Sequence, residues 1–122
     1  MKVLCGIGGS EDSFRALDRT VDRAAAADDD LTIAVVENAD ASVDPEEIVQ
    51  QAERAVEDAG IDAAVRRVDG DPGSRLTAIA EQEGFDEIVL GGGKTSPMGK
   101  ITIGPIAEFV LLNANTSVTL VR

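Results

Sequence analysis

Short, continuously apolar segments alternate along this chain with longer segments in which apolar residues recur every three or four positions. The first pattern is typical of strands buried on both faces of a sheet, and the second is typical of amphipathic helices. Helices between successive strands make those strands run parallel, with right-handed crossovers, so the alternation predicts an α/β fold. The expected strands span residues 2–7, 31–36, 61–68, 87–90 and 117–121, with 61–68 at a sheet edge.

Four helices are expected between these strands, and local signals mark their ends. Ser10, Asp44 and Asp71 suit helix N-caps, and Gly60 suits a stop after the second helix. The fourth helix is expected over residues 106–114. With 122 residues the chain has the length of one compact domain and no room for a second, which predicts a single doubly wound domain over residues 1–122.

A glycine-rich segment after the fourth expected strand is the main candidate for a binding site. Consecutive glycines let backbone N–H groups approach a ligand closely, and the start of the next helix offers N–H groups to an anion. The candidate phosphate-binding residues of this segment are Gly91, Gly93, Lys94, Lys100, Gly104 and Pro105. The alternative is that the glycines only turn the chain and the lysines are solvated.

Two well-known nucleotide motifs do not fit the sequence. A Walker loop that ended at Gly93-Lys94 would need glycine five positions before Gly93, where the chain has Ile88. A dinucleotide fingerprint that began at Gly6 would need its third glycine at position 11, where the chain has Glu11. Both motifs are therefore rejected.

The composition argues against catalysis and metal binding. The chain has no histidine, which removes the commonest general base and the commonest transition-metal ligand. No nucleophile and base pair can be assembled near the loops without it, so we assign no catalytic and no metal-binding residues. Cys5 lies alone in an apolar run, and we expect a buried structural thiol there.

The net charge of -12 predicts repulsion from nucleic acid, which we exclude as a partner. We interpret the acidic surface as an adaptation to molar salt, where charge repulsion is screened; a moderately acidic mesophilic protein is the alternative. No apolar run reaches the length of about 18 residues that a membrane span needs, and no secretory signal is recognisable. We therefore expect a cytoplasmic protein without membrane contact.

Motifs at both ends of the chain resemble those of the universal stress protein family. That family opens with a strand and an Asp-Gly-Ser-like turn, here Gly8-Gly9-Ser10. It closes with G-x-x-G, nine residues, G-(S/T) and a helix of the V-A-E-x-V-L type, here Gly91 to Lys94, nine residues, Gly104-Pro105 and residues 106–111. The resemblance covers essentially the whole chain. It implies a five-stranded parallel sheet of order 3-2-1-4-5, and ATP binding and dimer formation are common in the family.

Three departures fall on family positions that matter for nucleotide binding. The acid at the end of the first strand is Gly8, the second motif glycine is Lys94, and the hydroxyl residue after Gly104 is Pro105. Pro105 lacks both the hydroxyl and a backbone N–H, and Lys94 brings a side chain where a bare backbone would approach. Ser10 can contact a ligand, although its helix-capping role is a sufficient explanation for it.

We therefore expect a non-catalytic, regulatory stress-protein-like module whose nucleotide site is weakened, so that ATP binds weakly or not at all. One alternative is a member that still binds ATP, with Lys94 or Lys100 on the phosphates and slow hydrolysis. Another is an interaction scaffold without a small ligand. A homodimer through the last strand is expected, because in the family order this strand lies at an open sheet edge.

Overall fold

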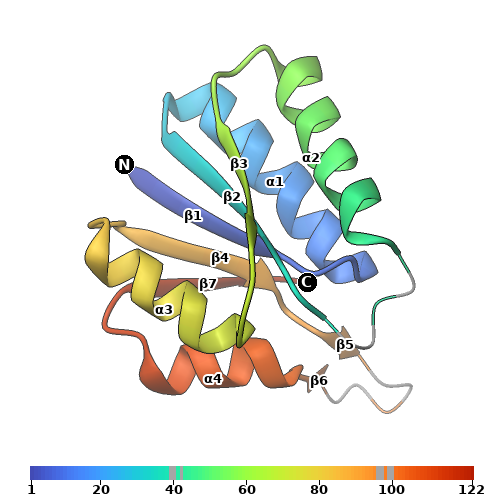
Figure 1. Ribbon diagram of the computed structural model, residues 1–122, viewed down its shortest axis with the longest axis vertical. Helices are drawn as coiled ribbons and strands as arrows, with labels where there is room; N and C mark the ends of the chain where they lie inside the picture. Colours follow the sequence, from blue (N-terminus) through green and yellow to red (C-terminus); the bar gives the residue numbers. More distant parts are fainter. Residues whose placement is uncertain (39–40, 42, 96–97, 99–100) are drawn as a thin grey trace.

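The computed structural model describes residues 1–38, 41, 43–95, 98 and 101–122, with backbone only for 94, 95, 101 and 102. Strands and helices alternate along these residues, except for a small hairpin of two short strands late in the chain (Figure 1). In chain order the elements are β1 (Lys2–Ile7), α1 (Glu11–Ala27), β2 (Asp30–Val36), α2 (Pro45–Ala59), β3 (Ala64–Val68), α3 (Pro72–Gln82), β4 (Glu87–Gly91), β5 (Lys94–Thr95), β6 (Ile101–Thr102), α4 (Pro105–Asn113) and β7 (Ser117–Val121).

The main sheet has five parallel strands in the order β3-β2-β1-β4-β7 within the described part of the chain. This confirms the predicted order 3-2-1-4-5, since β7 is its fifth strand. Helices α1 and α2 cover one face of the sheet, and α3 and α4 cover the other (Figure 1). From β1 the chain builds outward to β2 and β3 on one side, and later to β4 and β7 on the other.

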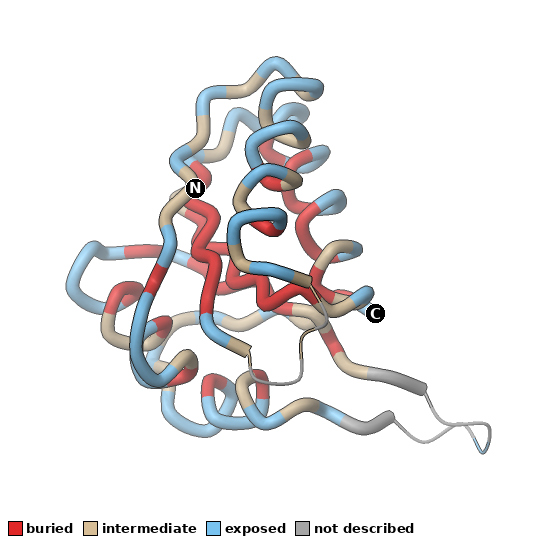
Figure 2. Tube along the Cα trace, turned by 45° about the vertical axis from the view of Figure 1, so that its right-hand side comes forward, coloured by how far each residue is buried: buried red, intermediate tan, exposed pale blue. Residues whose placement is uncertain are grey.

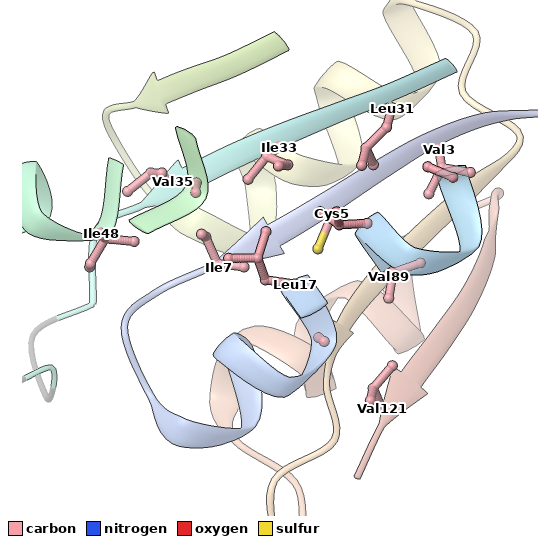
Figure 3. Close-up of a cluster of buried hydrophobic side chains, with 14 residues drawn as sticks. Val3, Cys5, Ile7, Leu17, Leu31, Ile33, Val35, Ile48, Val89 and Val121 are labelled. Carbon is pink, nitrogen blue, oxygen red and sulfur yellow. The ribbon is translucent and has the colours of Figure 1, made fainter. Parts of the chain in front are cut away.

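The core has two halves because successive side chains of a strand point to opposite faces. Val3, Cys5 and Ile7 of β1 pack beneath α1 and α2 (Figure 3), whereas Leu4 belongs to the cluster under α3 and α4. Buried residues are concentrated in the central strands, and the outer faces of the helices are exposed (Figure 2). The continuous apolar run of β1 thus reflects burial on both faces, as predicted.

The predicted helix signals are confirmed at the N-termini of three helices. Ser10, Asp44 and Asp71 each accept a hydrogen bond from the first turn, from the backbone N–H groups of Ser13, Glu46 and Ser74, respectively. Gly60 ends α2 in the left-handed conformation, with φ 67°. The three N-terminal capping bonds satisfy N–H groups that the helix itself leaves without a partner, and the Gly60 N–H donates to the Glu57 carbonyl at the other end of α2.

Several predicted boundaries need correction, by one residue at the start of β2 and at the end of β4. The third strand starts at Ala64 rather than at residue 61, because Ile61 and Ala63 pack against the core without joining the strand ladder. Helix α4 begins at Pro105 and ends at Asn113, one residue earlier at each end than predicted. The hairpin of β5 and β6 was not predicted, because its two-residue strands are too short to show a periodic pattern.

An ion-pair cluster lies where β4 begins. Glu87, the first residue of β4, accepts a hydrogen bond from Arg23 of α1 at 2.9 Å and another from the Thr119 hydroxyl of β7. The Arg23 guanidinium also lies 3.4 Å from the Asp29 carboxylate, and the N-terminal amino group lies 3.5 Å from the same carboxylate. The cluster ties α1, β4 and β7 together.

None of the described helices is both long and apolar enough to cross a membrane.

Candidate functional site

A hollow lies beyond the carboxyl ends of β1 and β4, where the strand order reverses. Adjacent strands there lead into connections on opposite sides of the sheet, which leaves a crevice for a ligand. The cavity has a volume of about 910 Å³. It is lined by Gly6, Gly8, Gly9, Ser10, Glu11, Asp12, Ser13, Phe14, Val36, Asn38, Ala41, Val43, Leu76, Leu90, Gly91, Gly93, Gly104, Pro105, Ile106 and Ala107.

The turn after β1 forms one wall of this cavity and is held by a local hydrogen-bond network. The Ser10 hydroxyl accepts from the Ser13 N–H at 3.3 Å, and the Ser13 hydroxyl donates to the Ser10 carbonyl at 2.8 Å. The Gly9 N–H in turn donates to the Ser13 hydroxyl oxygen at 3.2 Å. Gly9 has φ +93°, which favours glycine. Ser10 is therefore a helix cap, as predicted, and it lines the cavity as well.

Asn38, just beyond the end of β2, lies directly against Gly8. A Cβ atom built on Gly8 would be 3.1 Å from the Asn38 Cβ and 3.3 Å from its Nδ2. An acidic residue at position 8 would therefore require Asn38 to move by a few tenths of an ångström. The sequence alone did not single out Asn38, although its place after a buried strand could have indicated it.

The glycine segment after β4 packs closely against the start of α1. A Cβ atom on Gly91 would lie 2.7 Å from the backbone carbonyl carbon of Asp12 and 2.8 Å from the Ser13 N. Only glycine fits there, because the obstructing atoms belong to the backbone. The Gly93 N–H donates to the Asp12 carboxylate Oδ2 at 2.9 Å. The glycine segment and the first turn of α1 thus form one continuous wall.

Asp12 is the acidic group in closest contact with this wall. Partial burial acts to raise its pKa, but hydrogen bonds from the Ser10 hydroxyl and the Gly93 N–H, together with the charge of Arg15, outweigh that effect and lower the pKa. Asp12 is therefore ionised at neutral pH and is a weak proton acceptor. Asp12 was not among the predicted site residues, and its position two residues after the N-cap Ser10 is the one sequence signal that could have indicated it.

The N-terminus of α4 forms the opposite wall. Gly104 is its N-cap and makes no side-chain capping bond, and Pro105 follows as the first helical residue. A Cβ atom on Gly104 would meet nothing within 4 Å, and its φ of -68° suits any residue. Gly104 therefore leaves open space in front of the helix end rather than serving a steric need.

Six of the eight predicted site residues line the cavity together: Gly8, Ser10, Gly91, Gly93, Gly104 and Pro105. The backbone of Lys94 lies in β5, next to Gly93, and its side chain is outside the described structure. Lys100 and part of the connector over residues 37–43 also fall outside the described residues. The apolar lining includes Val36, Leu76 and Leu90, which are also buried residues of the core.

A smaller hollow of about 410 Å³ adjoins the cavity between the starts of α3 and α4. The two hollows share Asn38, Pro105 and Ile106 as lining residues. Across the described residues, no three potential ligand side chains gather closely enough to hold a metal ion. The described lining residues offer backbone N–H groups, two carboxylates, hydroxyls and apolar surface, which suits a partly apolar organic ligand.

The sequence and the fold match those of known proteins. The family model of the universal stress proteins matches residues 1–122. A universal stress protein solved in complex with cAMP is 28% identical, with a TM-score of 0.77 and coverage of 100% of this chain and 96% of that chain. One from Archaeoglobus fulgidus is 19% identical, with a TM-score of 0.82 and coverage of 100% and 98%, respectively.

A universal stress protein family member from Arabidopsis thaliana with AMP bound is 15% identical, with a TM-score of 0.73 and coverage of 99% of this chain and 90% of that chain. At such low identity, the Archaeoglobus and Arabidopsis structures demonstrate a shared fold alone. No curated protein matches the chain. Because the family model extends over residues 1–122 and the sheet has the family's strand order, the chain belongs to the universal stress protein family.

Proposed function

We propose that this protein is a non-catalytic stress-response module that binds an adenine nucleotide in the cavity beyond β1 and β4. The observation that carries the proposal is the cavity of about 910 Å³. The glycine segment after β4 and the N-terminus of α4, the two candidate anion-binding segments, both line it. This volume lies within the range of about 300–1,000 Å³ that is usual for small-ligand sites. The relative solved with cAMP, matched over nearly its full length, supports a nucleotide as the ligand class.

We further propose that the site is weakened toward ATP. Among the described lining residues there is no lysine or arginine, whereas Glu11 and Asp12 bring negative charge. Pro105 at the start of α4 removes one N–H donor that a phosphate group would use. A polyphosphate would therefore meet few donors and a field of its own sign, so a nucleotide with a single phosphate is the better fit.

The non-catalytic part of the proposal rests on the chemistry of the described lining. The Ser10 hydroxyl caps α1, and the pKa of Asp12 is lowered, which makes it a poor general base. Neither group is prepared to activate water or a nucleophile. Nucleotide occupancy would then act as a signal that changes the surface around the cavity, and not as the first step of a reaction.

Calorimetric titration with adenosine, AMP, cAMP and ATP, at a salt concentration where the protein is folded, tests the proposal. We expect AMP or cAMP to bind more tightly than ATP. The proposal would be contradicted if none of these compounds gave a heat of binding, or if ATP bound with a Kd in the micromolar range or lower. Gly104→Leu should reduce binding by filling the open space before α4, and Gly104→Ser is the matched control, since its small side chain also suits an N-cap.

A further inference from the structure

The carboxylate of Asp12 lies where the glycine segment would otherwise face an anion. Its Oδ2 accepts the Gly93 N–H at 2.9 Å, and the same oxygen would be 2.6 Å from a Cβ atom built on Gly91. Gly91, Gly93 and Asp12 all line the cavity. The carboxylate therefore packs against Gly91 and accepts the hydrogen bond of the Gly93 N–H, which a bound anion would otherwise receive.

The position of this carboxylate is set by rigid neighbours. Asp12 lies in the first turn of α1, which the Ser10 cap holds, and Gly91 ends β4 in the ladder with β7. The backbone of Gly91 approaches that of Asp12 so closely that no side chain fits between them. Rotating the carboxylate away would break its bond to Gly93 and move its charge out of contact with that N–H.

We propose that Asp12 is a specificity-determining residue that acts as a built-in anion on the glycine segment and selects nucleosides and singly phosphorylated nucleotides over triphosphates. This inference rests on the proposed nucleotide site and names the residue that sets its selectivity. A phosphate group entering at Gly93 would have to displace the carboxylate or accept its repulsion at close range. That cost grows with the number of phosphate groups, because each one adds negative charge near Asp12.

Asp12→Asn is the sharpest test, because the amide has the same shape, can still accept the Gly93 N–H and carries no charge. Asp18→Asn is the matched control: it removes the same charge from an exposed position of the same helix, outside the cavity. Calorimetry would compare ATP with adenosine for the parent and both variants at one salt concentration. Circular dichroism would first show that each variant is folded.

We expect Asp12→Asn to raise the affinity for ATP by about tenfold or more and that for adenosine by less than about twofold. Asp18→Asn should leave the ratio of the two affinities within about twofold of the parent value, because exposed charges at a distance are screened. An unchanged ratio in Asp12→Asn, or an equal change in Asp18→Asn, would overturn the inference while the nucleotide site stands. If neither compound binds any of the three proteins, the proposed function fails, and the inference fails with it.

Amide NMR provides a readout that does not depend on the ligand. In Asp12→Ala, which removes the acceptor, the Gly93 amide proton should shift upfield and exchange faster with solvent, while Asp18→Ala should leave it unchanged. A Gly93 signal that is the same in Asp12→Ala and in the parent would show that the carboxylate does not occupy this donor in solution. The inference would then be wrong.

Discussion

Replacing Arg23 with alanine should destabilise the fold far more than the same change at Arg66. The Arg23 guanidinium lies 2.9 Å from the Glu87 carboxylate and 3.4 Å from the Asp29 carboxylate, and these two side chains are only 9% and 6% exposed. Arg66 pairs with Glu83 at 2.8 Å, but those two side chains are 39% and 41% exposed. The two substitutions thus differ mainly in the burial of the carboxylates left behind.

The structure sets the expected magnitudes. Breaking a fully buried ion pair by removing one partner costs about 3–5 kcal/mol. Arg23 is 46% exposed, so water reaches the pair, and the expected loss in the free energy of unfolding is about 2–3 kcal/mol. For Arg66→Ala the loss should stay below about 1 kcal/mol, as is usual for exposed pairs. Urea unfolding at pH 7 and one fixed salt concentration would measure both.

The effect of Glu87→Gln on stability should have opposite signs in the parent protein and in the Arg23→Ala variant. Glu87→Gln should destabilise the parent protein, because it weakens the bond from Arg23. In the Arg23→Ala background the same change should stabilise, by about 1 kcal/mol, because it removes a buried charge that has lost its cationic partner. The reasoning is refuted if Arg23→Ala costs no more than Arg66→Ala, or if Glu87→Gln destabilises both backgrounds equally.

Four other predictions concern salt, assembly, the Cys5 thiol and the departures from the family's nucleotide-binding motifs. The midpoint of thermal unfolding should rise steeply with KCl, since 23 acidic residues oppose 11 basic ones; a midpoint that is equal in dilute buffer and in molar salt would contradict this. The protein should sediment as a homodimer through the edge strand β7, and Leu120→Pro should give a folded monomer; a monomeric parent would exclude this interface. Burial raises the pKa of Cys5 to about 12, so its thiol should resist Ellman's reagent at pH 8 until urea unfolds the chain, and rapid labelling of the native protein would refute this. Pro105→Ser should strengthen ATP binding at least about tenfold, because it returns a hydroxyl and a backbone N–H at the start of α4, and calorimetry that finds no gain in the folded variant would show that this position does not limit affinity.

Much of the fold could be predicted from the sequence because its determinants are local. The apolar run of β1 and the apolar stripes of the helices indicated which segments would be buried, and they are. The N-caps Ser10, Asp44 and Asp71 were recognisable because each bonds to a residue two or three positions away. The strand order followed from the family resemblance, not from the periodicity.

The candidate site was only partly predictable. Gly91, Gly93 and Gly104 could be identified because consecutive glycines and a helix start are visible as letters, and the carboxyl ends of parallel strands meet at one edge. The hairpin of β5 and β6 and the late start of β3 were missed. The limits of these strands depend on which backbone groups form hydrogen bonds with a neighbouring strand, and a short apolar pattern does not indicate those partners.

The sequence by itself thus determined the strands of the main sheet, the four helices, the two-sided burial of the sheet and the glycine segment, because local conformational preference and hydrophobic periodicity act over a few residues. Only the tertiary structure brought Asp12 to Gly93, across 81 positions of the chain, and Asn38 to Gly8. Those contacts arise where separate strands end side by side. The character of the site therefore depends on side chains that become neighbours only once the sheet has formed.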